Sequence, residues 1–120
     1  VEATAFGAKM INDRFISEGV KIDGVIAIGG VAKKNPFVMQ IVADVLNVPI
    51  RVASSDQTVA LGAAMAASVV AGVHPDMTAA QKAMGGGFEK VYKPDPVSAR
   101  RYETLFKKYK KLGEFVEKEM

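Results

Sequence analysis

The amino-acid sequence predicts an α/β domain in which parallel strands alternate with helices. Two short runs rich in apolar and β-branched residues, 24–28 and 50–53, have the length and composition of buried strands. Helix-forming segments precede, separate and follow these runs. Parallel strands need a crossover between them, and crossovers of this kind are right-handed. The alternation therefore favours a parallel sheet with flanking helices.

The first expected element is a helix over residues 2–18. Its apolar residues come in pairs one helical turn apart, Phe6 with Met10 and Ile11 with Phe15. Together these pairs give the helix a broad apolar face. We therefore expect the helix to be heavily buried.

The first strand, 24–28, ends at Gly29 and Gly30, and a helix is expected to begin behind Asn35 and Pro36. The strand is apolar on both faces, as central strands of parallel sheets are. Asparagine is a favoured N-cap residue, and proline is a favoured first helical residue. Because glycine lacks a Cβ, a flat ring or a phosphate can approach the turn closely. The following helix would direct its positive end to the same place.

This glycine turn is open to a second interpretation. Gly-Gly also occurs as an ordinary turn between a strand and a helix, with the asparagine acting only as a cap. The segment lacks the Lys-Ser/Thr pair of a Walker loop and the third glycine of the dinucleotide fingerprint. A nucleotide site here rests on the general preference of open α/β sheets to bind ligands at strand ends. Lys33 and Lys34 could contact a phosphate, although lysines at a helix start are usually solvated.

The second helix, 36–46, is expected to have a wide apolar face and a polar side. Its apolar face combines two sets at four-residue spacing, Phe37, Ile41, Val45 and Val38, Val42, Leu46. Its polar side is lined by Gln40, Asp44 and Asn47. This pattern is typical of a helix that packs on one side and faces solvent on the other.

The third helix, 57–71, follows the second strand and consists mostly of small residues. Ser54, Ser55 and Asp56 precede it and are expected to cap it. Its small side chains would let it approach a sheet or another helix closely. A nucleophile cluster is an alternative interpretation of the three capping residues, but no histidine lies near them in the sequence to activate a serine.

Less regular patterns follow the third helix. A short helix over 76–84 is expected, with Asp76 or Thr78 as its cap. The glycine triplet 85–87 follows a helix instead of a strand, which indicates a turn or hinge and not a phosphate cradle. Residues 91–92 could form a short extended piece.

The last expected element is a helix that opens at Asp95–Pro96 and extends to about Lys118. Its lysine-rich side is interpreted as a solvated face, because interspersed glutamates dilute the charge that a nucleic-acid or membrane surface would need. Those lysines are Lys107, Lys108, Lys110 and Lys111. Alternating three- and four-residue spacing also predicts one packed stripe. The stripe consists of Tyr102, Leu105, Tyr109, Leu112 and Val116.

Composition narrows the class of protein. With 120 residues, 49% of them hydrophobic, the chain has one domain's worth of sequence and enough apolar residues for a core. The absence of cysteine removes disulfides and thiolate zinc sites and favours the cytoplasm. The single histidine, His74, has no ligand-spaced acids beside it, so no metal site is expected. The longest apolar run, 59–73, is shorter than the ~20 residues of a membrane span, and no signal segment opens the chain.

Three segments together resemble the C-terminal domain of the FGGY carbohydrate kinases. They are residues 29–36 (Gly-Gly-Val-Ala-Lys-Lys-Asn-Pro), 39–46 (Met-Gln-Ile-Val-Ala-Asp-Val-Leu) and 56–64 (Asp-Gln-Thr-Val-Ala-Leu-Gly-Ala-Ala). The resemblance covers nearly the whole chain. The third segment brings it closest to the members that convert L-ribulose to L-ribulose 5-phosphate in arabinose catabolism.

The resemblance implies part of a ribonuclease-H-like lobe of the actin-like ATPase fold, truncated at its N-terminal side. Two such lobes hold ATP between them in this family. The chain begins within a helix and without methionine, so we expect it to be the C-terminal portion of a larger domain. We expect residues 1–73 to form the nucleotide-binding core, 74–94 a loop with a short helix, and 95–118 a terminal helix.

The resemblance also implies which residues contact the nucleotide. By the family pattern, Gly29, Gly30 and Asn35 would contact adenosine, with Lys33 and Lys34 as neighbours. The helix at 57–71 would be structural and pack beneath the nucleotide-binding sheet.

The implied activity is transfer of a phosphoryl group from ATP to a ketopentose, with Mg²⁺. The phosphate-binding hairpin, the catalytic base and the Mg²⁺ ligands are expected outside this chain, in a missing N-terminal lobe. The chain is therefore expected to hold no catalytic residue and no metal ligand, and to be inactive alone. No nucleic-acid or membrane partner is expected, and the oligomeric state is open. The alternatives are a non-catalytic nucleotide-binding module of the same superfold or a structural α/β domain without a ligand.

Overall fold

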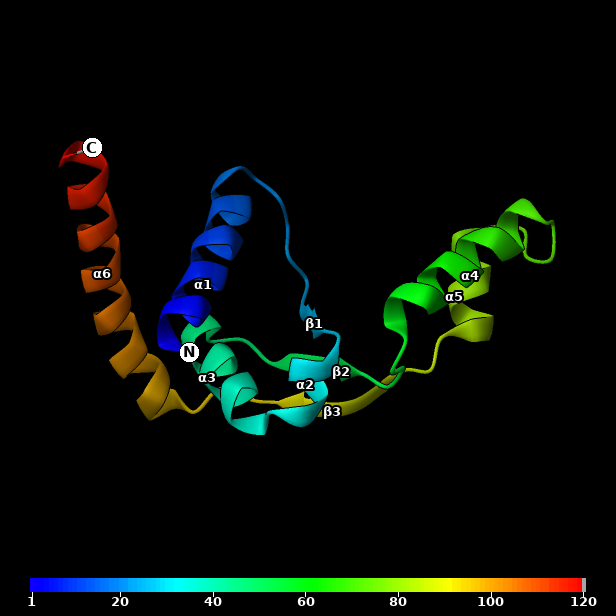
Figure 1. Cartoon of the computed structure of the whole chain (residues 1–120), viewed down its shortest axis with the longest axis horizontal. Helices are drawn as coiled ribbons and strands as arrows, with labels where there is room; N and C mark the ends of the chain where they lie inside the picture. Colours follow the sequence, from blue (N-terminus) through cyan, green and yellow to red (C-terminus); the bar gives the residue numbers. More distant parts are fainter. Residues whose placement is uncertain (120) are drawn as a thin grey trace.

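The computed structural model describes residues 1–119, which form six helices and three strands around one small sheet. The molecule is elongated, with principal extents of 54 × 30 × 23 Å. Figure 1 shows two groups of helices at opposite ends: α1, α3 and α6 gather at one end, whereas α4 and α5 project from the other. The sheet joins the two groups.

The sheet contains β1 (Val25–Ala27), β2 (Ile50–Ala53) and β3 (Phe88–Tyr92), in the order β1-β2-β3. β1 and β2 are parallel, which confirms the predicted pairing of the first two strands. β3 is antiparallel to β2; the sequence predicted only a short extended piece at 91–92 and no pairing for it. Only the last residue of β3 is buried, and the strand therefore carries no alternation of apolar and polar residues that would have identified it.

β1 is an edge strand of this sheet, and the expectation of a central strand buried on both faces is wrong for residues 1–119. It pairs with β2 along one side only. Ile26 in the strand and Ile28 just after it are 57% and 51% exposed. The apolar residues that suggested a central strand therefore lie at an uncovered edge.

Two helices connect β1 to β2, and the sequence predicted only the second. The short helix α2 (Gly30–Lys34) follows the glycine turn directly. Helix α3 (Pro36–Leu46) begins where predicted, with Asn35 as its N-cap and proline as its first residue. The Asn35 Oδ1 accepts a hydrogen bond of 3.2 Å from the backbone N–H of Val38, which confirms the predicted cap.

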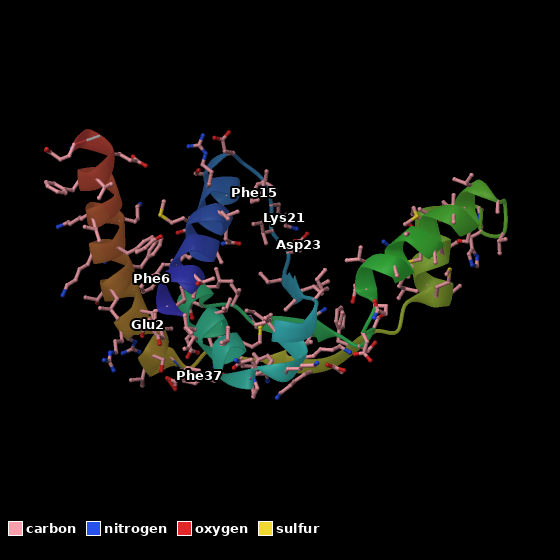
Figure 2. The ribbon with its side chains drawn as sticks, viewed as in Figure 1. Glu2, Phe6, Phe15, Lys21, Asp23 and Phe37 are labelled. Atoms are coloured by element: carbon pink, nitrogen blue, oxygen red, sulfur yellow. The ribbon has the colours of Figure 1, made fainter. Side chains whose placement is uncertain are left out.

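The burial of α3 departs from its amphipathic pattern at one apolar residue, which is exposed, and at one charged residue, which is buried. Phe37, expected on the packed face, is 69% exposed, and Figure 2 places it at the outer edge of the molecule. Asp44, expected on the polar side, is only 5% exposed. Its Oδ1 accepts hydrogen bonds of 2.8 Å from the Gln40 Nε2 and from the backbone N–H of Asp95. The polar side of α3 therefore forms the junction with the start of α6 instead of facing solvent.

Replacing Asp44 with alanine should lower the free energy of unfolding by about 2 kcal/mol, because it removes the buried carboxylate that accepts two partly buried hydrogen bonds at the junction of α3 and α6. Chemical denaturation of the unaltered chain and of Asp44→Ala measures the difference in the free energy of unfolding. The matched control is Asp13→Ala, a change at a more exposed carboxylate that pairs with Lys9. We expect the control to change the free energy by less than about 0.5 kcal/mol. Equal effects of the two changes would contradict a structural role for Asp44.

Helices α1 (Glu2–Ser17) and α6 (Pro96–Glu119) pack against α3 through one apolar cluster. Asp95 caps α6 as predicted, because its Oδ1 accepts from the backbone N–H groups of Val97 and Ser98. Those hydrogen bonds lower the pKa of the Asp95 carboxyl. The buried members of the cluster are Ala5, Phe6, Ile41, Val45 and Phe106.

The heavy burial expected for α1 is wrong, and so is the continuous packed stripe expected for α6. In α1 only Ala5 and Phe6 are buried, whereas Phe15 is 51% exposed. In α6 the stripe ends after its middle, and Leu112 is 62% exposed. Figure 1 shows that both helices extend well past α3, so α3 covers only the parts of them that lie near it.

Helices α4 (Thr58–Val70) and α5 (Met77–Met84) pack on each other at the far end of the sheet. The expectation that α4 packs beneath the sheet is wrong here, since its small residues contact α5 instead and only Met65 is buried. The cap of α5 is confirmed, because Asp76 Oδ1 accepts a hydrogen bond of 2.8 Å from the backbone N–H of Ala79. No helix within residues 1–119 has the length and apolarity needed to cross a membrane.

Candidate functional site

The turn at Gly29 and Gly30 lies at the carboxyl end of β1. Gly29 has φ 86° and ψ 178°, a combination that residues with a Cβ rarely adopt. Gly30 is the first residue of α2 and has no positive φ. The backbone conformation therefore requires glycine at position 29 but not at position 30.

Both glycines present bare backbone to open space. They are exposed, and a Cβ built on either one meets no neighbouring atom within 4 Å. Among residues 1–119 no side chain covers this surface of the turn. A planar group could therefore lie against the peptide of Gly30 without displacing any part of the chain.

Asn35 is held at the far end of α2 by its role as the cap of α3. Its Oδ1 is used by the backbone N–H of Val38. No residue in the described part of the chain accepts a hydrogen bond from its Nδ2. The side chain is exposed, so this amide N–H₂ group is free to donate to a ligand next to α2.

Lys33 and Lys34 have different surroundings, which their sequence did not indicate. The side chain of Lys33 is 15% exposed, and its Nζ contacts three oxygens. It donates to the carbonyl oxygen of Ser54 at 2.5 Å and to Asp56 Oδ1 at 2.6 Å, and it pairs with Glu89 Oε2 at 3.3 Å. Lys34 is exposed and forms no hydrogen bond or ion pair with any residue in 1–119.

The contacts of Lys33 shift the pKa values of the groups involved. The hydrogen bond to Asp56 is the main cause that raises the Lys33 pKa, against the opposing effect of burial. The same hydrogen bond lowers the pKa of Asp56. Asp56 therefore stabilises the fold above the ordinary carboxyl pKa of about 4, and this contribution is lost as the pH falls through its lowered value. At high pH, the contribution of Lys33 to the stability of the fold is lost as the pH rises through the raised pKa of its ammonium group.

The structure does not support the predicted cap of α4 by three side chains. Gln57 occupies the N-cap position and makes no side-chain cap bond. Ser55 contributes locally, because its Oγ accepts from the Gln57 N–H at 3.2 Å and its carbonyl from Thr58 at 3.0 Å. Asp56 pairs with Lys33 instead, because the turn carries it back toward α2.

A mostly apolar cleft lies beside the turn, between the end of the sheet and the α4–α5 pair. Ile28, which directly precedes Gly29, is one of its lining residues. The glycine triplet 85–87 forms part of its wall, and a Cβ at Gly86 would lie 2.6 Å from the Ser54 Oγ. A side chain at 86 would have to displace the Ser54 hydroxyl, and a Cβ at Gly85 would meet the backbone oxygen of Gln81, so the triplet allows close packing here, a role that the prediction of a turn or hinge missed. The cleft is lined by Ile26, Ile28, Ala53, Ser54, Ser55, Thr58, Leu61, Gly62, Met65, Gln81, Gly85, Gly86, Gly87 and Phe88.

The described residues contain no group of three or more His, Asp or Glu side chains that could hold a metal ion. His74 lies in the connection between α4 and α5, far along the chain from the glycine turn. The groups available to a ligand are therefore the bare backbone of the turn at the start of α2 and the Asn35 amide at its end, with the apolar cleft beside the turn.

Comparison with known proteins gives a consistent set of similarities. Residues 1–71 match the model of the C-terminal domain of the FGGY family of carbohydrate kinases. A ribulokinase of Vibrio parahaemolyticus is 47% identical over 121 residues, which cover 98% of this chain and 21% of that protein. A ribulokinase of Geobacillus thermodenitrificans is 43% identical, with 96% of this chain and 21% of that protein covered. The chain thus spans about a fifth of the length of these curated relatives.

Solved structures show the same fold. The xylulose kinase of Rhodospirillum rubrum matches 97% of this chain and 23% of its own, with a TM-score of 0.78 and 22% identity. The gluconate kinase of Lactobacillus acidophilus matches 82% of this chain and 20% of its own, with a TM-score of 0.71 and 29% identity. The match to the xylulose kinase includes α5, β3 and α6, which follow the segment that the family model matches.

Proposed function

The chain belongs to the FGGY family of carbohydrate kinases, to its C-terminal domain, and from this premise we propose that it supplies the adenosine-binding wall of an ATP-dependent sugar kinase. The observation that carries the proposal is the Gly29–Gly30 turn. It ends a strand of the sheet, and its backbone is uncovered among residues 1–119. Open α/β sheets bind ligands at this end of their strands.

The two glycines differ in how strongly they indicate a bound nucleotide. The backbone conformation accounts for Gly29, so that residue would be needed even in a domain without a ligand. Gly30 has a conformation that other residues adopt and an empty space where a side chain would stand. Close approach of a planar base would explain why no side chain occupies that space. Gly30 is therefore the better indicator of a bound nucleotide.

Asn35 and Lys34 complete the proposed nucleotide contacts. The Nδ2 of Asn35 could donate to the base or the ribose without disturbing the cap, which uses Oδ1. Lys34 is exposed and its ammonium is available to a phosphate. Lys33 differs from both, since its ammonium is occupied by Ser54, Asp56 and Glu89. We therefore assign it no direct nucleotide contact.

We propose L-ribulose as the sugar and arabinose catabolism as the setting, because the relatives with 47% and 43% identity are named ribulokinases. ATP and Mg²⁺ would supply the phosphoryl group and neutralise its charge. The residues described here offer no metal cluster, so we assign the Mg²⁺ ligands, the phosphate-binding hairpin and the catalytic base to the rest of the enzyme. In this proposal the chain binds adenosine and carries no catalytic residue.

The proposal also includes the organisation of the chain. Residues 1–73 would form the nucleotide-binding core, 74–94 a connecting segment with a short helix, and 95–118 a terminal helix. The partner would be the N-terminal lobe of the same enzyme, in the cytoplasm.

A segment replacement tests the proposal. The segment of the Vibrio parahaemolyticus ribulokinase that aligns with this chain is exchanged for residues 1–120, and ATP-dependent phosphorylation of L-ribulose is measured. We expect the hybrid to be active and the isolated chain to show no turnover, because phosphoryl transfer needs groups outside the chain. Turnover by the isolated chain would contradict the division of roles.

The two alternative functions, a structural domain and a non-catalytic nucleotide-binding module, predict different results for the isolated chain and the hybrid. NMR titration of the isolated chain with ATP should shift the amide signals of Gly29, Gly30 and Asn35. A purely structural domain would give no such shifts, and the hybrid would then be insensitive to changes at Gly30. A non-catalytic nucleotide-binding module would give the shifts in the isolated chain but an inactive hybrid.

A further inference from the structure

The ammonium of Lys33 joins three separate parts of the chain. Lys33 itself belongs to α2. Ser54 and Asp56 lie in the connection from β2 to α4, and Glu89 lies in β3 just after the glycine triplet that follows α5. We propose that Lys33 is a positioning residue that couples the Gly29–Gly30 turn to the base of the α4–α5 pair.

The contacts match the chemistry of a lysine side chain. An ammonium group has three N–H donors, and here three oxygens surround it at 2.5, 2.6 and 3.3 Å. The side chain is 15% exposed, whereas the side chain of Asp56 is 84% exposed. The stem of Lys33 thus packs within the fold, while its head binds the connection from β2 to α4 and Glu89 of β3, the strand that follows α5.

The α4–α5 pair needs such a cross-link because it projects from the end of the sheet (Figure 1). Its two connections to the sheet, 54–57 and 85–87, lie next to each other. The backbone N–H and the Oγ of Ser54 donate to the carbonyl oxygen of Gly87 at 3.1 and 3.2 Å. Gly87 has a positive φ of 72°, so the second connection depends on a flexible residue type. Lys33 ties the first connection to α2 directly, and the second follows through the hydrogen bonds between Ser54 and Gly87.

The same residue also contacts the turn through its backbone. The N–H of Lys33 donates to the carbonyl oxygen of Gly29 at 3.3 Å. A displacement of α4–α5 that moves Ser54 or Asp56 therefore acts on α2 and on the turn at its start. The mechanical coupling stands on these contacts alone. Its consequence for nucleotide binding rests on the proposed function.

Amide hydrogen exchange in the isolated chain tests the cross-link. We expect Lys33→Met to accelerate exchange of the Ser54 amide roughly two- to fivefold, as expected for loss of a partly exposed ion-pair network. Methionine keeps the length of the stem and removes the charge. The matched control is Lys34→Met at the neighbouring exposed lysine, which should leave exchange at Ser54 unchanged. Equal exchange in the two variants would overturn the proposal.

Salt and the partner residues separate an ionic cross-link from simple packing. At about 1 M NaCl, where screening acts within about 3 Å, exchange at Ser54 should accelerate in the unaltered chain but not in Lys33→Met. Asp56→Asn and Glu89→Gln keep Lys33 in place and should each accelerate the exchange partially. These two variants decide the question if Lys33→Met fails to fold. If the exchange rate of the Ser54 amide changed neither with salt nor in either variant, the ionic coupling would be overturned.

Adding ATP tests the consequence for the turn. In the unaltered chain, ATP should slow exchange at Ser54 and shift the Gly29 and Gly30 signals. In Lys33→Met the glycine signals should still shift, while exchange at Ser54 no longer responds. A response at Ser54 that persists in Lys33→Met would overturn the coupling. Absence of glycine shifts in the unaltered chain would count against the proposed function, while the exchange measurements without ATP still decide the cross-link.

Discussion

Replacing Phe106 with alanine should lower the free energy of unfolding by about 3–4 kcal/mol, the range typical of a buried phenylalanine. Phe106 is 6% exposed and belongs to the cluster that holds α1, α3 and α6 together. Its ring lies 5.8 Å from the ring of Phe6, and the Lys9 ammonium lies 5.2 Å from the ring centroid. Truncation would remove these contacts and leave a cavity between three helices.

Chemical denaturation followed by far-UV circular dichroism measures this loss. The matched control is Phe115→Ala in the same helix, because Phe115 is 63% exposed. We expect the control to change the free energy of unfolding by less than about 0.5 kcal/mol. If the two variants were equally stable, α6 would not be held by the cluster.

Replacing Gly29 with valine should cost about 3 kcal/mol of stability, because a β-branched residue is strongly disfavoured at positive φ. The φ of 86° and ψ of 178° at this position allow little but glycine. No neighbouring atom lies within 4 Å of a built Cβ, so the cost comes from the backbone and not from a steric contact with another residue. Chemical denaturation measures this effect as well.

Gly30→Ala is the matched control for Gly29→Val and separates stability from binding. Gly30 begins α2 and has no positive φ, so alanine there should preserve stability or raise it by up to about 1 kcal/mol. In the active hybrid, however, the added methyl group would lie where the base is proposed to approach. We expect the Kd for ATP to rise about tenfold, equivalent to about 1.4 kcal/mol. Unchanged ATP binding in Gly30→Ala would remove Gly30 from the proposed site.

Local features of the fold were predictable because they depend on residues close together in the sequence. The cap of α3 by Asn35, the following Pro36 and the parallel strands on either side of α3 all follow from short-range preferences. The strand β2 was predicted with the bounds that the structure has, Ile50–Ala53. Short α2 was missed, since five residues are too few for a periodic pattern to appear.

Burial was the least predictable property. The sequence shows which residues are apolar, but not whether another element covers them. Phe6 and Phe15 lie on the same helix, yet Phe6 is buried and Phe15 is 51% exposed. Figure 2 places Phe6 between α1 and α6, and Phe15 near the far end of α1. Asp44 was misjudged in the opposite direction, because its buried position depends on a donor 51 residues away in the sequence, the N–H of Asp95.

The candidate site also has features that the sequence alone predicts and features that depend on tertiary contacts. The glycine turn and the capping asparagine are properties of a short contiguous segment, and the family resemblance rests on three such segments, so the sequence alone determined them. The different environments of Lys33 and Lys34 were decided by tertiary structure, because the oxygens that surround the Lys33 ammonium come from residues 54, 56 and 89. An adjacent pair of identical residues carries no local signal that tells one from the other. Only the folding of β2, β3 and α2 onto one another gives Lys33 its partners and leaves Lys34 in solvent.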